Sequence, residues 1–347
     1  MKVAIAHPDL AVRARLEALI RDVFGVESAW VADDFEEVQL RFRREPPELI
    51  LLSLDLSGGR LQDLTKEIVS SSPCAVLLLE GNQPVAVSTV FDCLGHGATD
   101  VARLPVNPLT ADVDDFMMLR ERFATLKTLI GSQGKSSSPD ASFHAPPERS
   151  PLILALGAST GGPKALAEII EHLPPDFPAA VLIVQHLDAH FYSGLAEWLA
   201  NGSRLPVHAV DRPISIEAGQ IYIAARQEHM VLSPGNRLSF TREWPDLICC
   251  PSIDVLFNSI ADIRGARGVG VILTGMGRDG AEGLLALRRA GFYTLAQDAP
   301  SSIVYGMPKA AADIGAATTV LPLERIGDRI VDKIRALATT HEEGSNL

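Results

Sequence analysis

The sequence predicts an α/β protein of two domains, and three observations support this. The chain has 347 residues, more than one ordinary domain needs, and 47% of them are hydrophobic. Short aliphatic runs alternate with helical segments in both halves. Residues 131–151, GSQGKSSSPDASFHAPPERSP, are rich in Ser, Pro and Gly, which is typical of a linker. We therefore expect one domain over residues 1–125, a linker over 126–150 and a second domain over 151–340.

The first half of the chain consists of strand-like and helix-like segments in alternation. KVAIA, ELILLSL and AVLLL are short aliphatic runs and are expected to form strands. AVRARLEALIRDVF and LQDLTKEIVSS have the spacing of amphipathic helices. Such alternation predicts a parallel sheet with helices on both faces.

The second half repeats this pattern around LILALG, AAVLIVQH and GVGVILTG, which predict the strands of a doubly wound, mostly parallel sheet. Between them lies AVDRPISIEAGQIYIAARQEHMVLSPGNRLSF, residues 209–240, which is dense in turn residues. We expect this segment to form antiparallel hairpins.

The charge balance limits the classes of partner. The formal net charge is -12 and the pI is near 5.2, which argues against nucleic acid and anionic membranes as broad partners. No run approaches the roughly 20 apolar residues that span a bilayer, and the N-terminus lacks the features of a signal peptide. We expect a cytoplasmic protein with no membrane insertion.

The cysteines show no metal-binding or redox pattern. Cys74, Cys93, Cys249 and Cys250 include no CxxC pair and no zinc-site spacing, so we expect buried or incidental thiols and no metal site. Four histidines are expected on surfaces or in loops, and we assign them no role. They are His172, His190, His208 and His229.

The glycine-rich stretch LGASTGG, residues 156–162, fits a nucleotide site poorly. Gly157 and Gly162 have the separation of P-loop glycines, but Pro163 stands where that loop needs Lys. Ser159 stands where a dinucleotide fingerprint needs its second Gly. The spacing instead matches G-x-S-x-G, in which a serine nucleophile occupies a tight turn between a strand and a helix. The alternative is an ordinary βα turn with Ser159 as helix N-cap.

Two other strand ends carry residues that would complete a nucleophilic site. The run VLIV leads to His186, and GVGVILTG is followed by Asp279. The carboxyl ends of parallel strands meet at one edge of a sheet, so Ser159, His186 and Asp279 are expected to converge as nucleophile, base and orienting carboxylate. Taken singly, His186 could be a hydrogen-bonded strand-end histidine and Asp279 a helix cap. The chain order Ser, His, Asp differs from that of the α/β-hydrolases.

Five separated segments together resemble the catalytic domain of the CheB-type chemotaxis protein-glutamate methylesterases. They are LGASTGGPKAL, VQHL, PSIDVLFNSIA, ILTGMGRDGAEGL and GMPKAA, in the family's order. The resemblance implies that Ser159, His186 and Asp279 are catalytic. It also implies that Thr160 and the backbone near Met276 stabilise the oxyanion.

The same resemblance implies the substrate. The enzyme would hydrolyse glutamyl methyl esters on the cytoplasmic domain of a methyl-accepting chemoreceptor, and some members of the family also deamidate glutamines. No metal or organic cofactor is required for this chemistry. One position departs from the family, because Cys250 precedes Pro251 where an Arg is common.

The first 125 residues resemble a response-regulator receiver domain, which has a flavodoxin-like (βα)5 fold. Receivers are phosphorylated on an Asp after the third strand and bind Mg²⁺ through that Asp and an acidic pair after the first strand. The chemical positions have all changed in this chain. The residues found there are His7 and Pro8 at the acidic pair, Ser53 at the acceptor, Leu79 at the Ser or Thr, and Leu104 at the Lys.

We interpret this domain as a pseudo-receiver that is not phosphorylated, with Asp55 as a less favoured substitute acceptor. A chemosensory kinase or adaptor is a further candidate partner, which would bind this pseudo-receiver domain. Two other functions stay open for the whole chain. One is a non-catalytic regulatory module, and the other is a serine hydrolase that acts on another ester.

Overall fold

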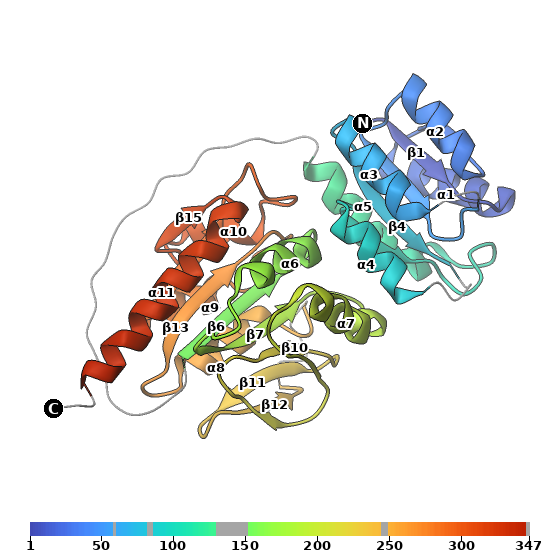
Figure 1. The fold of residues 1–347 in the computed structure, drawn as a ribbon. Helices are drawn as coiled ribbons and strands as arrows, with labels where there is room; N and C mark the ends of the chain where they lie inside the picture. Colours follow the sequence, from blue (N-terminus) through green and yellow to red (C-terminus); the bar gives the residue numbers. More distant parts are fainter. Residues whose placement is uncertain (58–59, 82–85, 130–151, 244–248, 345–347) are drawn as a thin grey trace. The chain divides into compact units, whose positions relative to one another are not determined.

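The computed structural model describes residues 1–57, 60–81, 86–129, 152–243 and 249–344 (Figure 1). The chain forms two compact units, Met1–Gly134 and Lys135–Leu347, and each is described by itself. The boundaries expected near residues 125, 150 and 340 stay predictions. Helix α5 (Met117–Leu129) continues past residue 125, and helix α11 (Leu323–Gly344) continues past residue 340.

The described part of the N-terminal unit is a parallel sheet in the order β2-β1-β3-β4-β5. This is the flavodoxin-like order, which confirms the predicted fold of this unit. Its strands are β1 (Val3–Ala6), β2 (Ser28–Ala32), β3 (Leu49–Ser53), β4 (Ala75–Glu80) and β5 (Asp100–Arg103). Its helices are α1 (Leu10–Phe24), α2 (Phe35–Arg44), α3 (Leu61–Ser71), α4 (Val87–Gly95), the 3₁₀ helix η1 (Val113–Phe116) and α5.

Local sequence signals explain the first helix of this unit. The Asp9 carboxylate accepts hydrogen bonds from the backbone N–H groups of Ala11 and Val12, so Asp9 is an N-cap. Gly25 ends the helix in the left-handed conformation, at φ 63°. Strands β1 and β3 are buried along their whole length, because helices cover the sheet.

The C-terminal unit has a larger sheet. Among the described residues its strands lie in the order β15-β14-β13-β6-β7-β10-β8, and all the pairings between them are parallel. The strands of this sheet are β6 (Leu152–Ala158), β7 (Ala179–Gln185), β8 (Val207–Val210), β10 (Ile221–Ala224), β13 (Arg267–Ile272), β14 (Tyr293–Gln297) and β15 (Thr319–Leu321). Both β6 and β7 are buried along their whole length, which accounts for their continuous apolar sequences.

The helices of the C-terminal unit form two groups, as expected for a doubly wound sheet (Figure 1). Helix α6 contacts α7 and α11, and helix α9 contacts α8 and α10. The helices not yet given are α6 (Gly162–His172), the 3₁₀ helix η2 (Ala189–Phe191), α7 (Tyr192–Gly202), α8 (Ile253–Ala261), α9 (Ala281–Arg289) and α10 (Met307–Asp313).

The prediction of an antiparallel section within residues 209–240 is confirmed, but it is wrong for one strand of that segment. Strands β9 (Ile214–Ser215), β11 (His229–Ser233) and β12 (Arg237–Thr241) form a separate antiparallel sheet in the order β11-β12-β9. Strand β10, within the same segment, instead joins the main sheet in parallel between β7 and β8. All of its side chains, IYIA, are buried, and such a continuous apolar run suits an interior parallel strand.

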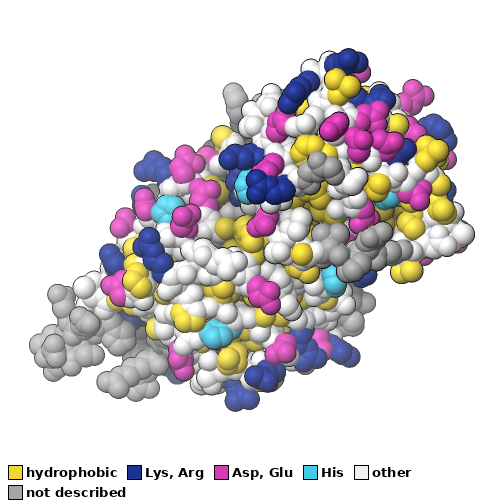
Figure 2. Space-filling model, turned by 45° about the vertical axis from the view of Figure 1, so that its right-hand side comes forward, with side chains coloured by type: hydrophobic (Ala, Val, Ile, Leu, Met, Phe, Trp, Pro, Cys, Tyr) yellow, Lys and Arg dark blue, Asp and Glu magenta, His cyan; other side chains and the backbone are white. Residues whose placement is uncertain are grey.

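Two general features bear on partners. None of the described helices combines the length and the apolar composition that crossing a bilayer requires. On the face drawn in Figure 2, acidic and basic side chains are interspersed.

Candidate active site

The three candidate catalytic residues follow three neighbouring strands. Strand β6 pairs with β13 on one side and with β7 on the other. Ser159 follows β6, His186 follows β7 and Asp279 lies in the turn between β13 and α9. The chain leaves β6 toward β7 and later returns to the other side of β6 with β13, so this is the switch point at which open α/β sheets form their sites.

The Ser159 turn is tied to both neighbouring strand ends. The Ser159 N–H donates to the Thr274 carbonyl at 3.0 Å. The buried Gln185 side chain donates to the carbonyls of Ser159 at 2.8 Å and His186 at 2.9 Å. Ser159 does not cap helix α6, because the N-cap is Gly161, in the left-handed conformation at φ 76°. The serine is therefore held by its backbone.

His186 and Asp279 form a direct pair. Imidazole Nε2 and carboxylate Oδ2 lie 2.8 Å apart, and each side chain is 12% exposed. Burial by itself lowers the pKa of His186, but the hydrogen bonds to Asp279 and Cys249 outweigh it and raise the pKa above its usual value. The His186 N–H donates to the Ala158 carbonyl at 3.0 Å, which places this residue beside the Ser159 turn. The contacts of the described residues include no hydrogen bond from the Ser159 hydroxyl to this imidazole.

Asp279 is anchored at the N-terminus of helix α8, which the sequence did not reveal. Its carboxylate accepts from the backbone N–H groups of Ile253 at 2.7 Å and Asp254 at 3.1 Å. The Ser252 hydroxyl donates to Oδ1 at 2.7 Å, and the same oxygen of Ser252 caps α8 by accepting from Val255. The positive end of a helix favours a carboxylate, and these bonds and His186 lower the pKa of Asp279 against the effect of burial.

A second carboxyl group lies beside Asp279. Asp254 accepts a hydrogen bond from the Gly283 N–H at 2.6 Å, and burial together with the charge of Asp279 raises its pKa to about 6. Two neighbouring carboxyl groups thus have environments that move their pKa values in opposite directions. The group that contacts His186 is the one that stays ionised.

The position expected for His229 is wrong. His229 lies in strand β11, is buried, and accepts a hydrogen bond from the Ser252 N–H at 3.1 Å. It therefore supports the Ser252 anchor, where we had expected a surface or loop position without a role. Of the other three, His172 and His190 are exposed, and His208 is half-buried in strand β8.

The expected oxyanion residues lie on two adjacent turns. Thr160 follows Ser159 and is buried, and its carbonyl accepts from the Thr274 hydroxyl at 2.9 Å. Met276 follows β13 and its side chain is exposed. The hydrogen bond from Ser159 to Thr274 joins these two turns. Their role in oxyanion binding stays a prediction.

Gly275 offers a test of how closely these turns must approach. A Cβ atom at this position would lie 2.6 Å from Cβ of Ser159 and 2.5 Å from Sδ of Met307. We expect Gly275→Ala to displace Ser159 and to lower the esterase rate by about 100-fold, the cost of roughly 1 Å of misplacement. Gly202→Ala is the matched control, because a Cβ there meets no atom within 4 Å. Equal rates for the two variants would contradict this packing argument.

Comparison with known proteins decides the family. The family model for CheB methylesterase matches residues 154–330. A protein-glutamate methylesterase/protein-glutamine glutaminase of Burkholderia thailandensis is 40% identical over 306 residues, which cover 88% of this chain and 90% of that protein. The chain belongs to the CheB methylesterase family.

Two further relatives support this membership. A protein of the same name from Cupriavidus metallidurans is 39% identical and covers 95% of this chain and 98% of its own length. The crystal structure of the Thermotoga maritima CheB methylesterase catalytic domain matches with a TM-score of 0.50 and 33% identity. That match covers 53% of this chain and 99% of that structure.

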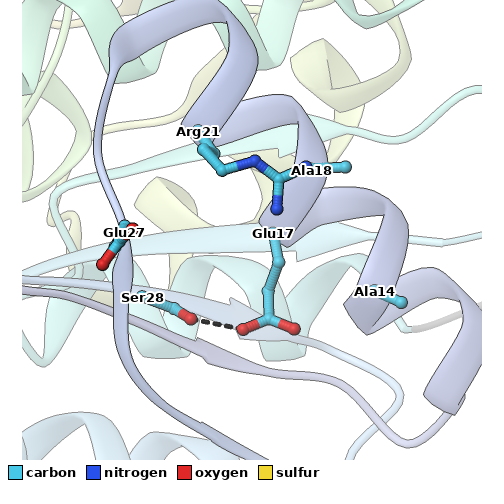
Figure 3. A pocket seen from close by; sticks show the side chains of 6 residues that line it. All are labelled: Ala14, Glu17, Ala18, Arg21, Glu27 and Ser28. Atoms are coloured by element: carbon cyan, nitrogen blue, oxygen red, sulfur yellow. Dashed lines mark hydrogen bonds between the residues drawn. The ribbon is translucent and has the colours of Figure 1, made fainter.

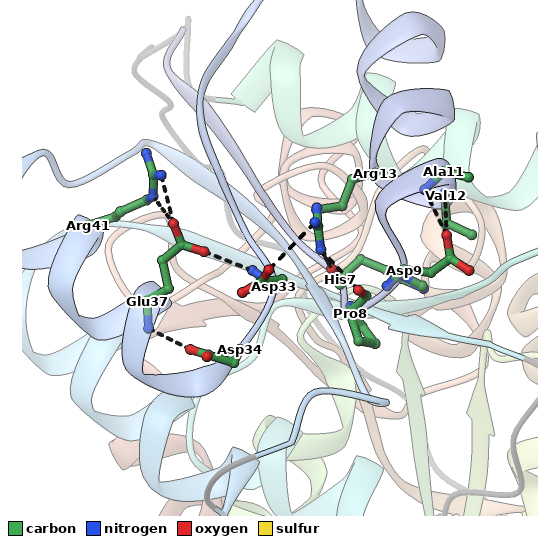
Figure 4. A network of polar contacts seen from close by, with 10 residues as sticks. All are labelled: His7, Pro8, Asp9, Ala11, Val12, Arg13, Asp33, Asp34, Glu37 and Arg41. Carbon is green, nitrogen blue, oxygen red and sulfur yellow. Dashed lines mark hydrogen bonds and ion pairs between the residues drawn. The ribbon is translucent and has the colours of Figure 1, made fainter.

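In this CheB methylesterase family member, Arg13 of helix α1 lies between the residues that follow β1 and Asp33, which follows β2 (Figure 4). His7 is buried directly after β1, and Pro8 follows it. The Arg13 guanidinium donates to the carbonyls of both residues and pairs with Asp33 at 3.7 Å. Burial lowers the pKa of His7, which disfavours a positive charge there.

The other positions that the resemblance to receivers singles out are apolar or internally hydrogen-bonded. Leu79 in β4 and Leu104 after β5 are buried. Ser53 ends β3, is fully buried, and accepts a hydrogen bond from the Asp55 N–H at 3.1 Å. Burial raises the pKa of Asp55. In this unit the carboxylates of Asp55 and Asp9 both lie near enough to His7 to oppose the effect of its burial on the pKa.

A hollow in the N-terminal unit lies between α1 and the start of β2, with a volume of about 430 Å³ (Figure 3). Its lining is mainly polar, and the Ser28 hydroxyl donates to the Glu17 carboxylate across it. The lining residues are Ala14, Glu17, Ala18, Arg21, Glu27 and Ser28. Ligand sites are mostly apolar with a few converging polar groups, so we assign this hollow no function.

Proposed function

We propose that this protein is a protein-glutamate methylesterase and protein-glutamine glutaminase of chemoreceptors, with Ser159 as nucleophile, His186 as base and Asp279 as orienting carboxylate. The observation that carries the proposal is the convergence of these residues at three adjacent strand ends, with His186 and Asp279 in a 2.8 Å hydrogen bond. The names of the relatives indicate the two activities.

The first half of the reaction forms a glutamyl-serine ester. Ser159 Oγ attacks the ester carbonyl carbon of a methylated glutamate while His186 takes the hydroxyl proton. Thr160 and the backbone near Met276 stabilise the negative charge that develops on the carbonyl oxygen. The bond to the methoxy group then breaks, and His186 gives its proton to the leaving methanol.

The second half releases the product. His186 removes a proton from water, which attacks the glutamyl-serine carbonyl and yields the free glutamate side chain and Ser159. A glutamine side chain follows the same course with ammonia as the leaving group, because its amide carbonyl accepts the same attack. Asp279 stays ionised throughout and stabilises the imidazolium.

The anchoring of Asp279 explains why the pair is prepared before substrate binds. Its contacts with the Ser252 hydroxyl and with the N–H groups of Ile253 and Asp254 fix both carboxylate oxygens. A fixed carboxylate holds the imidazole in one orientation, which lowers the cost of reorganisation during the reaction. This argument favours an enzyme over a non-catalytic module.

Mass spectrometry of chemoreceptor cytoplasmic fragments tests both activities. Fragments that carry glutamyl methyl esters and glutamines are incubated with the protein, and each peptide is assigned by its mass. We expect methyl esters and selected glutamines to become glutamates. Hydrolysis of simple esters without any change in the receptor peptides would instead support a serine hydrolase with another substrate.

We propose that the N-terminal unit is a pseudo-receiver that contacts a chemosensory kinase or adaptor, and that the protein acts in the cytoplasm on the cytoplasmic part of the receptor. Arg13 and His7 occupy the region where a receiver concentrates negative charge for Mg²⁺. With His7 and Pro8 in place of the expected acidic pair and the Arg13 guanidinium beside them, we expect weak Mg²⁺ binding and control through a binding partner instead of phosphorylation.

Small phosphodonors should therefore have no effect. With acetyl phosphate and Mg²⁺ we expect no acyl-phosphate in the intact mass and an unchanged esterase rate, because Ser53 replaces the acceptor and its hydroxyl is buried. A phosphorylated protein that loses its label in the Asp55→Asn variant, together with a higher esterase rate in the wild type, would show that Asp55 is a working acceptor.

A further inference from the structure

A third metal-ligating side chain lies beside the His186–Asp279 pair. One ring nitrogen of His186, the sulfur of Cys249 and one carboxylate oxygen of Asp279 all lie within 4.8 Å of one another. Among the described residues this is the one group of three or more His, Cys, Asp or Glu side chains with that proximity. The catalytic mechanism uses His186 and Asp279 but gives Cys249 no role.

The three donor atoms match the preference of zinc. Imidazole nitrogen, thiolate sulfur and carboxylate oxygen bind Zn²⁺ at about 2.0 to 2.3 Å, in a tetrahedral arrangement whose fourth position water can fill. Donor atoms around such an ion lie about 3.4 to 3.7 Å apart, as follows from those bond lengths. The donor atoms lie within 4.8 Å of one another, so movements of about 1 Å would bring them to the separations found around a bound ion.

We propose that His186, Cys249 and Asp279 form a site for a zinc-like divalent cation, and that an ion bound there inhibits ester hydrolysis. The Cys249 thiol gives its proton to the solvent as the sulfur–metal bond forms. A neutral imidazole has one basic lone pair, and the ion takes it, so His186 can no longer accept the proton of Ser159. Zinc here opposes catalysis and is not a cofactor.

Two features favour occupation of this site. Asp279 is already positioned by Ser252 and by the N–H groups at the start of α8, and such outer contacts orient metal ligands. Cys249 is partly exposed, so an ion can reach the site from the solvent. The negative charge of Asp279 offsets part of the charge of the ion. Cys74 and Cys93 do not compete for the ion, because both are buried in the other unit.

Metal binding and inhibition are measured separately, because only the inhibition rests on the proposed function. Binding is followed by the ultraviolet charge-transfer absorbance of Cd²⁺ bound to thiolate, titrated into the full-length protein. Inhibition is followed by the hydrolysis rate of a simple ester at rising Zn²⁺ concentration, normalised to the metal-free rate of the same variant. We compare the wild type with Cys249→Ala and with Cys250→Ala, which removes the exposed neighbouring thiol.

We expect one Cd²⁺ per chain in the wild type and loss of the thiolate absorbance in Cys249→Ala. The affinity for Zn²⁺, taken from the concentration that halves the ester rate, should fall by more than about 100-fold in Cys249→Ala. A direct ligand contributes more than an outer contact, whose loss costs about 10- to 100-fold. Cys250→Ala should keep the wild-type affinity. Absence of the absorbance, or equal Zn²⁺ affinities for wild type and Cys249→Ala, overturns the site. Bound Cd²⁺ with full activity under Zn²⁺ overturns the inhibition.

Two further outcomes are also decisive. If Cys249→Ala does not fold, Cys249→Ser replaces it, and the same loss of Cd²⁺ absorbance is expected. If no metal-free sample hydrolyses any ester, the proposed function fails, while the Cd²⁺ titration still accepts or rejects the metal site.

Discussion

Ser159→Ala should lower ester hydrolysis by about a million-fold, because the variant has no oxygen nucleophile at this turn. The fold should persist. The hydrogen bonds described for Ser159 use its backbone N–H and carbonyl, which alanine retains. We expect the free energy of unfolding to change by less than about 1 kcal/mol.

The rate and the stability of this variant are measured on the same preparation, by ester hydrolysis and by thermal unfolding. Ser70→Ala is the matched control, since Ser70 is exposed on helix α3 in the other unit. It should keep the wild-type rate. A Ser159→Ala protein with more than a tenth of the wild-type rate would require another nucleophile.

Asp279→Asn should lower the rate by about 10⁴-fold, the loss found when the carboxylate of a Ser-His-Asp triad becomes an amide. Both oxygens of Asp279 accept hydrogen bonds, Oδ2 from His186 and Ile253 and Oδ1 from Ser252 and Asp254. The NH₂ group of an asparagine would face hydrogen-bond donors in place of either oxygen, because both oxygens of Asp279 accept. The side chain therefore no longer holds the imidazole in its orientation. Leaving such groups unsatisfied also costs about 1 to 3 kcal/mol of stability.

Asp254→Asn separates these two effects. Asp254 lies beside Asp279 and accepts from the Gly283 N–H, but no hydrogen bond joins it to His186 among the described contacts. We expect a comparable loss of stability and less than about a tenfold loss of rate. If the rate falls by the same factor in Asp279→Asn and Asp254→Asn, damage to the start of helix α8 explains the result, and the orienting role of Asp279 is wrong.

Much of the fold was predictable because the apolar runs are local signals. KVAIA, LILALG and AAVLIVQH correspond to buried parallel strands, since a strand covered on both faces needs apolar side chains at every position. The error over residues 209–240 has a physical cause. The turn residues around IYIA are typical of hairpins, and only the packing of β10 against β7 assigns that run to the main sheet.

The candidate site was predictable where a reactive residue directly follows an aliphatic strand, as Ser159 and His186 do. The supporting contacts were not. The anchor from Ser252 to Asp279 and the proximity of Cys249 to His186 join residues that are distant in sequence, and no local pattern encodes them. A serine before the helical run IDVLF was the available signal, but it indicates only a helix cap.

Methanol release from membranes that contain methylated chemoreceptors tests the central claim most directly. Receptor methyl groups are labelled, the full-length protein is added, and volatile methanol is collected over time. We predict release by the wild-type protein and only background release by Ser159→Ala. Background release by a wild-type sample that still hydrolyses simple esters would contradict the claim that receptor glutamyl esters are the substrate.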